Sequence, residues 1–259
     1  MLEGENMDKK YSFDKLQMFF GEDYKVADGI IISQPSIGDI MRFGEERFYD
    51  VLNPFIINPT SFRVVLWQNN IDWTKVSDYQ LFYHLILQIK PTIEQTSIIF
   101  GDLDFTKFQL FKRQDEIDGK QIEDTVLVNA EQKVMIDEEI YSHMACYLRT
   151  MFNIFPKVEK AKDKTTKEWM IEEDILNSKN KKKPESNLIS MISFCLNHPG
   201  FKYKKNELKD LGIVEFNDSV QRLLVYESTS SLMKGMYSGF VDTSKIDKNQ
   251  FDFMRDFHS

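Results

Sequence analysis

The sequence predicts an α+β protein that is mainly helical, and three observations support this fold class. Apolar residues recur at helical spacing in several stretches along both halves of the chain. One pair of extended segments near residues 106–128 flanks a turn, which is typical of a β-hairpin. The second half shows helical patterns alone. We therefore expect an α+β region over 1–156, a Lys-rich linker over 157–186 and an all-helical region over 187–259.

The first region opens with a β-branched run that leads into a helix. Residues 25–33 (KVADGIIIS) predict a strand, and Pro35 separates it from the next element. Ser36 and Asp39 stand three positions apart, as in a capping box at a helix N-terminus. Apolar residues then recur every three or four positions, so we expect a helix over about 36–52.

Two further helices follow. Asn58-Pro59 begins one of them, because proline is favoured in the first helical turn, and Asn69-Asn70 supplies a stop. Ser77 caps the other, whose body YQLFYHLILQI is apolar nearly all round and is closed by Pro91. A helix with this pattern is buried on several sides, so we expect it to form the core of the first region.

A β-hairpin and an amphipathic helix complete the first region. The segments TKFQLFKR and EDTVLVN are extended in pattern and flank a turn around Asp118-Gly119. Asp137 then caps a helix that ends before Pro156. The apolar face of this helix consists of Ile140, Met144, Tyr147, Leu148, Met151 and Phe152.

The linker and the second region differ in composition. Residues 157–186 combine alternating charges with the run NSKNKKKPES, so we expect a flexible, solvated segment. Apolar spacing then predicts helices over 186–196, 206–211 and about 217–236, followed by a last short helix over KNQFDFMRDF (248–257).

Composition and charge exclude several classes of protein. A formal net charge of −8 argues against a surface that follows nucleic acid along its whole length, because such a surface carries excess Lys and Arg. The N-terminal MLEGENMDKKYSFDK lacks the apolar core of a signal peptide, and no run approaches the roughly 18 apolar residues of a membrane span. Two cysteines are too few for a disulfide framework. We expect a cytoplasmic protein with free thiols.

No catalytic set of residues stands out. Ser231 and Lys234 match an S-x-x-K pattern, but the companion S-D-N and K-T-G motifs are missing, so a helix-surface pair explains them better. Asp102 and Asp104 could hold a divalent cation, yet no loop spacing supplies further carboxylates, and a turn is the simpler interpretation. We expect no enzymatic activity.

The histidines and cysteines require a separate test. His143-x-x-Cys146 and Cys195-x-x-His198 would together make a Cys2His2 zinc set, and they also offer a Cys-His catalytic pair. Both cysteines, however, lie in predicted apolar helices, where buried thiols are the common case. We therefore expect no metal and no cofactor.

One binding signal in the second region points to nucleic acid. The short helix NELKDL, Gly212 and the helix after it resemble a helix-turn-helix. Four acidic residues in the same stretch would repel a phosphate backbone, so a plain helical hairpin is preferred. The basic residues available for phosphate are Lys202, Lys204, Lys205, Lys209 and Arg222.

The other signal is a set of aromatic and methionine side chains near the C-terminus. Flexible thioethers and flat rings suit contacts with varied partners. The alternative is that these side chains dock onto their own domain, as aromatics near a chain end commonly do. The residues that we assign to a partner-binding surface are Leu232, Met233, Met236, Phe251, Phe253, Met254 and Phe257.

Two long stretches, 33–82 (SQPSIGDIM to DYQLF) and 197–255 (NHPGFKYKK to FDFMR), carry a resemblance to known proteins. They resemble proteins of the tail module of siphophages, tailed bacteriophages that infect Gram-positive gut bacteria. The resemblance implies a role similar to that of a tail assembly chaperone, which holds the tape-measure protein before the tail tube polymerises. It brings no catalytic residues.

From these observations we expect a phage structural or assembly protein that acts by protein–protein binding, with a tail assembly chaperone-like factor as the first hypothesis. A permanent tail or connector subunit of the virion is the second, and a phage DNA-binding regulator or packaging factor is the third. The expected partners are phage proteins such as the tape measure, or further copies of the chain. We expect no membrane, and nucleic acid is the less favoured partner. The expected location is the host cytoplasm, with the virion as the alternative.

Overall fold

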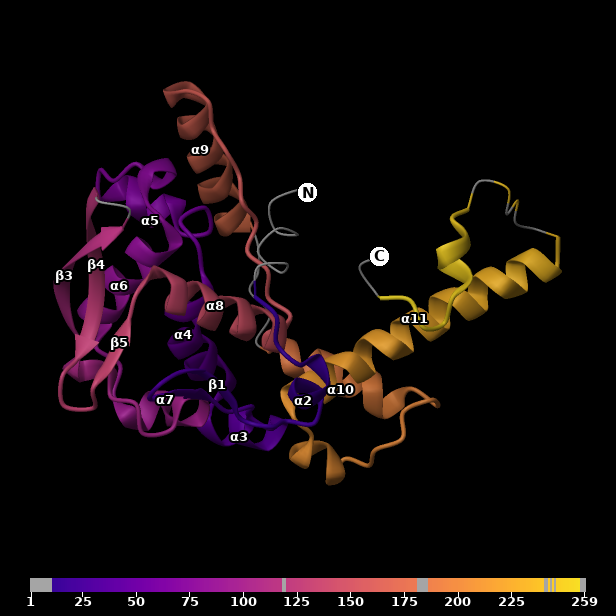
Figure 1. The fold of residues 1–259 in the computed structure, drawn as a ribbon. Coiled ribbons are helices and arrows are strands. Elements are labelled where there is room, and N and C mark those ends of the chain that lie inside the picture. Colours follow the sequence, from indigo (N-terminus) through magenta and orange to yellow (C-terminus); the bar gives the residue numbers. More distant parts are fainter. Residues whose placement is uncertain are drawn as a thin grey trace.

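The computed structural model describes residues 11–117, 120–180, 186–239, 242, 244 and 246–256. It confirms the predicted fold class, a mainly helical α+β protein with small antiparallel sheets. In Figure 1 the helices and sheets of the first half form a body, and two helices project from it. These are α9 (Lys164–Asn180) and the outer half of α11 (Ile213–Tyr237).

The strand predicted over 25–33 is a hairpin. After the short helix α2 (Lys15–Phe19), strand β1 (Tyr24–Ala27) pairs antiparallel with β2 (Ile30–Ile32). Gly29 makes the turn with a φ of 77°, a backbone conformation that residues with a Cβ rarely adopt. The Asp-Gly pair at this point is the signal that marks a tight hairpin.

The helix predicted over 36–52 is two helices, which corrects the prediction. The first, α3, spans Ile37–Phe43, and the second, α4, spans Glu45–Ile56. Gly44 separates them, because its φ of 95° lies outside the helical region and the chain must restart after it. The capping box predicted at Ser36 is present.

The helices that follow pack around buried apolar side chains. Helix α6 begins after Ser77 and ends at Ile89, shortly before Pro91 as predicted, and Phe82 and Ile86 on it are fully buried. A helix that was not predicted, α7, follows after a capping box at Thr92. The elements of this part are α5 (Arg63–Gln68), η1 (Trp73–Lys75), α6 (Asp78–Ile89), α7 (Ile93–Phe100) and η2 (Phe105–Lys107).

The hairpin predicted near 106–128 is confirmed. Strand β3 (Gln109–Ile117) pairs antiparallel with β4 (Lys120–Asn129), and its turn at 118–119 lies outside the described residues. A third strand, β5 (Val134–Ile136), adds to β4. The sheet is fixed to the helices where the Tyr79 hydroxyl donates to the carbonyl of Ile136 at 2.7 Å.

Helix α8 (Glu138–Phe152) is the centre of the body. Its predicted cap is present, since the Ile140 amide donates to the Asp137 carboxylate at 2.9 Å. The helix contacts α4, α6, β1, β5 and α11. Of the predicted apolar face, five residues are buried and Ile140 is partly buried: the buried five are Met144, Tyr147, Leu148, Met151 and Phe152.

The structure places helix α9 inside the range 157–186, where the sequence predicts a solvated linker. Ile171 is buried beside Leu66 and Trp73, in a small apolar cluster separate from the main core. The sequence pattern of α9 does not reveal this docking, because Ile171 is the one buried residue among the described side chains of this helix and most of the others are polar. The division of the chain at this range stays a prediction.

The second region is helical, as predicted, in its described residues. The helix expected from about 217 begins earlier, at Ile213. The helix expected over 248–257 is one 3-10 turn, and Phe257 lies outside the described residues. None of the described helices has the length and apolar character that a membrane crossing requires. The elements are α10 (Asn187–Asn197), η3 (Glu207–Asp210), α11 and η5 (Lys248–Phe251).

A backbone junction joins the two regions. The Ile37 amide donates to the carbonyl of Leu211 at 2.9 Å, and the Ile213 amide donates to the carbonyl of Pro35 at 3.0 Å. The main apolar core continues across this junction, since Ile213 and Phe216 belong to the same buried cluster as the body helices.

The close approach at the junction gives a first prediction. A Cβ on Gly38 would lie 2.8 Å from the carbonyl oxygen of Lys209, which is backbone and cannot swing away. We expect Gly38→Ala to lower the free energy of unfolding by about 1–3 kcal/mol, although alanine normally favours a helix over glycine. Urea denaturation measures this loss. Met41→Ala, on the exposed side of the same helix, serves as the control, and equal stability of the two variants would contradict the prediction.

The docking of α9 gives a second prediction. The Lys167 ammonium donates to both oxygens of Asp72 at 2.9 and 2.8 Å, and these hydrogen bonds lower the pKa of Asp72 from 3.8 to about 2. A carboxyl whose pKa is lowered by folding stabilises the fold above its unfolded pKa and loses this contribution as pH falls. We expect Asp72→Asn to cost about 1 kcal/mol at pH 6, with the difference from the wild type shrinking between pH 4 and pH 2. Urea unfolding across this range would refute the assignment if the difference stayed constant.

Candidate protein-binding surface

The outer half of α11 forms an arm. With 25 residues the helix spans about 38 Å. Its first turns pack on the body through Ile213 and Phe216, whereas its second half leaves the body and is accompanied by the returning segment 246–256 (Figure 1). We call residues 224–239 together with 246–256 the C-terminal arm.

A buried arginine links the returning segment of the arm to helix α11. Arg255 is 8% exposed, and its guanidinium donates to the carbonyls of Gln250 and Asp252, both at 3.1 Å, and to the Thr229 hydroxyl. The Thr229 hydroxyl in turn donates to the carbonyl of Gln250 at 3.2 Å, and Arg222 donates to the carbonyl of Arg255 at 3.0 Å. Charge-assisted hydrogen bonds of this kind are strong, so they hold the returning segment against α11.

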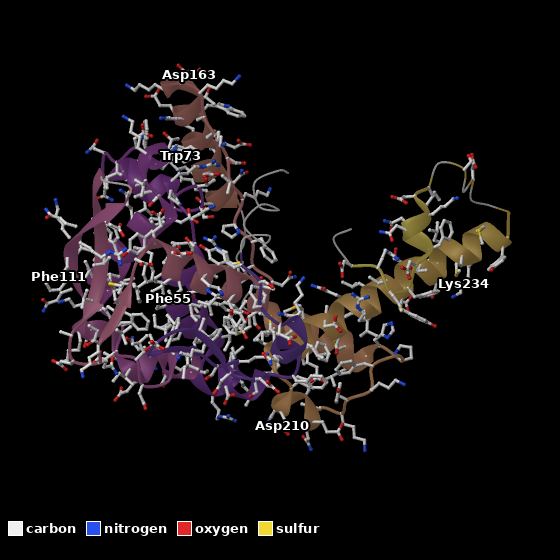
Figure 2. All side chains as sticks on the ribbon, viewed as in Figure 1. Phe55, Trp73, Phe111, Asp163, Asp210 and Lys234 are labelled. Carbon is white, nitrogen blue, oxygen red and sulfur yellow. The ribbon has the colours of Figure 1, made fainter. Side chains whose placement is uncertain are left out.

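The arm leaves apolar side chains in solvent. Tyr237 is 79% exposed, Met254 77% and Phe253 40%, although the Phe253 ring also contacts that of Tyr226. In Figure 2 the side chains of the arm, where Lys234 is labelled, stand apart from those of the body. Of the other predicted residues, Phe257 lies outside the described residues, and four are partly buried: Leu232, Met233, Met236 and Phe251.

The arrangement therefore differs from a tail that docks into its own core. Among the described elements, α11 is the one with which the returning turn η5 makes several contacts. An aromatic and Met-rich surface that its own domain does not cover is typical of a protein-binding site. Sequence patterns did not single out Tyr226 and Tyr237, because an exposed tyrosine has no periodic signal.

The helix-turn-helix hypothesis meets a physical obstacle. A recognition helix reads DNA with its N-terminal residues, but the start of α11 is sealed into the body. Ile213 is buried, and its amide is bonded to the carbonyl of Pro35. The lysines of the preceding loop are exposed, yet Glu207 and Glu215 lie close to them in the sequence. Glu207 accepts from the backbone amide of Lys204, and Glu215 accepts from the Tyr203 hydroxyl.

The histidine and cysteine pairs have separate surroundings. His143 lies 2.7 Å from the hydroxyl of Tyr24 and stacks on Tyr11, and burial lowers its pKa. His198 accepts from the Gly200 amide at 2.9 Å, so its other nitrogen donates to Glu227 at 2.9 Å. Both cysteines are buried. In the part of the chain that the structure describes, no group of three or more His, Cys, Asp or Glu is placed to hold a metal ion.

The remaining pairs have structural positions. The Asp104 carboxylate accepts from the Thr106 amide at 2.9 Å and so caps η2, in agreement with the turn interpretation. The main-chain carbonyl of Asp102 accepts from the side-chain amide of Gln132 at 2.7 Å. Ser231 and Lys234 are both exposed on the arm.

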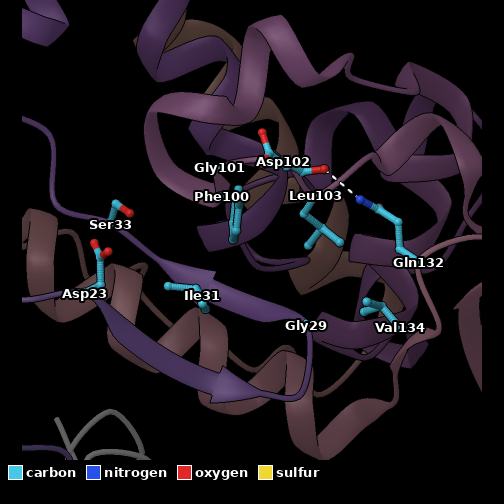
Figure 3. A pocket seen from close by; sticks show the side chains of 10 residues that line it. All are labelled: Asp23, Gly29, Ile31, Ser33, Phe100, Gly101, Asp102, Leu103, Gln132 and Val134. Atoms are coloured by element: carbon cyan, nitrogen blue, oxygen red, sulfur yellow. Dashed lines mark hydrogen bonds between the residues drawn. The ribbon is translucent and has the colours of Figure 1, made fainter.

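A cavity of about 550 Å³ lies between the β1–β2 hairpin, the end of α7 and the segment before β5 (Figure 3). Its apolar wall consists of Ile31, Phe100, Leu103 and Val134. Asp23, Asp102, Ser33 and Gln132 supply its polar groups, and its lining contains no His, Cys, Lys or Arg. The Ser33 hydroxyl has no histidine or lysine beside it in this lining that could act as the base to activate it.

The metal-free hypothesis is open to direct test. We expect elemental analysis of the purified protein to find no stoichiometric zinc, because His143 is hydrogen-bonded to the Tyr24 hydroxyl and His198 to the Glu227 carboxylate. Stoichiometric zinc, with loss of the fold on chelation, would overturn this expectation.

The role of Arg255 predicts how the arm comes apart. We expect Arg255→Ala to speed amide hydrogen exchange in 225–236 and 246–256 at least tenfold, because the returning segment loses its main hydrogen bonds. Exchange in α8 should not change, since the hydrogen bonds that the Arg255 guanidinium makes with described residues all lie within the arm. Lys248→Ala, on the exposed side of η5, is the control. Faster exchange in α8 to the same extent would show that the arm belongs to the core.

A comparison with protein-family models, curated proteins and solved structures finds no match to this chain.

Proposed function

We propose that this chain is a protein-binding factor in phage tail assembly, similar to a tail assembly chaperone, and that its C-terminal arm holds the partner. One observation carries the proposal: the arm leaves its body and keeps large apolar side chains, Tyr237 and Met254 above all, in solvent. Such side chains lose unfavourable contact with water when a partner covers them.

The arm combines a rigid support with adaptable contacts. The base of α11 is fixed by the junction with the body, and Arg255 fixes the returning segment. The contacting side chains are methionines and aromatic rings, which adapt to different apolar surfaces. A chaperone for a long helical client needs repeated weak contacts of this type.

A permanent subunit of the virion would bind its partner through the same surface. The chaperone hypothesis and the virion-subunit hypothesis therefore differ in whether the partner is released. A mature-virion proteome separates them. We expect the chain to be absent from finished particles, because a chaperone is released when the tube polymerises. A stoichiometric amount in purified particles would favour the structural subunit.

Substitutions on the arm test the binding surface. We expect Tyr237→Asp and Met254→Asp each to weaken binding to the tape-measure protein of the same genome at least tenfold, because a charge enters the apolar contact. Ser231→Asp, at another exposed position of α11, is the matched control. Isothermal titration measures the affinities, and thermal unfolding checks the fold. Unchanged binding in both arm variants would contradict the proposal.

A further inference from the structure

Helix α9 covers a second apolar surface of the body. Leu66 of α5, Trp73 of η1 and Leu81 of α6 are buried beneath it, in a cluster separate from the main core. From α9 itself, Ile171 is the residue buried in this cluster, with Met170 and Ile175 packed against its edge. We call Leu66, Trp73, Leu81 and the neighbouring Arg63 the α9 seat.

A buried cation fixes the position of α9 on this seat. The Arg63 side chain is 8% exposed, and its Nε and Nη2 donate to the two carboxylate oxygens of Asp174 at 2.6 and 2.8 Å. Its Nη1 donates to Glu159, and the guanidinium lies 5.7 Å from the centre of the Trp73 ring. A cation held at this depth requires a carboxylate opposite it, because leaving it buried and unpaired is strongly unfavourable.

The same helix buries little apolar surface. Its largest apolar side chains point away from the seat, since Trp169 is 62% exposed and Leu176 is 60% exposed. Helix α8, of similar length, buries nine residues. The seat also has an unused donor, because the buried Trp73 Nε1 has no hydrogen-bond partner among the described residues. A different helix could therefore bury more apolar surface on the seat.

We propose that the α9 seat is a second protein-binding site, distinct from the C-terminal arm, and that α9 occupies it in the free chain. The partner is an amphipathic helix in which an aliphatic residue is followed three positions later by Asp or Glu, the spacing of Ile171 and Asp174. The aliphatic residue fills the space between Leu66 and Trp73, and the carboxylate pairs with Arg63. Binding of the partner displaces α9 and exposes its whole length.

The charge of the seat selects the partner. A bidentate arginine–carboxylate pair has a fixed geometry, so a helix with Lys or Arg at the second position is excluded. In the free chain α9 competes from within the same molecule, at an effective concentration in the millimolar range. An external helix at micromolar concentration therefore binds well only when it outcompetes α9 or when α9 is weakened.

A labelled peptide with the sequence of residues 163–180 tests the seat directly. We expect fluorescence anisotropy to show micromolar binding of this peptide to full-length Ile171→Asp, in which the internal helix is weakened. The wild type and Leu176→Asp, altered on the exposed face of the same helix, should not bind the peptide at that concentration. Replacing Asp174 in the peptide by Asn should weaken binding at least tenfold, because the pair with Arg63 is lost.

Circular dichroism and thermal unfolding establish that Ile171→Asp retains its body. If that variant does not fold, the double variant Lys167→Ala/Asp174→Asn, which weakens α9 through its polar contacts, takes its place. The proposal fails if the peptide does not bind a folded variant of either kind, or if the Asp174→Asn peptide binds as tightly as the original. Neither outcome bears on the arm, so this test is independent of the proposed function.

Discussion

The short backbone junction between 35–38 and 211–213 determines the form of the molecule. Two amide-to-carbonyl hydrogen bonds cross it, and Ser36 and Gly212 form an antiparallel bridge. Glycines on both sides permit this approach, because a Cβ on Gly38 would meet the Lys209 carbonyl and one on Gly212 would meet the Gln34 side chain. Backbone hydrogen bonds at this distance are directional, so the start of α11 has a defined orientation on the body.

The arm is a consequence of this junction and of the length of α11. The helix begins inside the core and continues for 25 residues, and its outer half projects away from the body (Figure 1). Its outer half must therefore stand in solvent or meet another protein. The Arg255 hydrogen bonds add a second layer to the arm without returning it to the body. A fixed base with an adaptable outer surface is the arrangement on which the proposed function depends.

The sequence predicted the elements whose ends carry local chemical signals. Ser36, Ser77 and Asp137 cap helices because their side-chain oxygens accept from amides of the first turn, and this interaction involves neighbours alone. The break at Gly44 was missed because apolar spacing continues across it. Strand β5 has three residues, too few for a periodic pattern.

Long-range contacts explain the other differences. The docking of α9 depends on Arg63, which lies 111 positions before Asp174, so no local pattern reports it. On the arm, composition identified Met254 and Phe253 as surface residues of interest, but the burial of Arg255 follows from the return of the chain onto Thr229. Local sequence therefore predicted where apolar side chains gather, and tertiary contacts decide which of them remain exposed.

The central claim is that the C-terminal arm is the surface that meets a partner. Photo-crosslinking from a benzoyl-phenylalanine placed at Tyr237, in cells that make the chain naturally, tests it most directly. The account predicts a crosslink from this position to a tail protein identified by mass spectrometry, and none from Ile189, another highly exposed apolar position, on α10. Crosslinks from Ile189 to the same protein, with none from Tyr237, would contradict it.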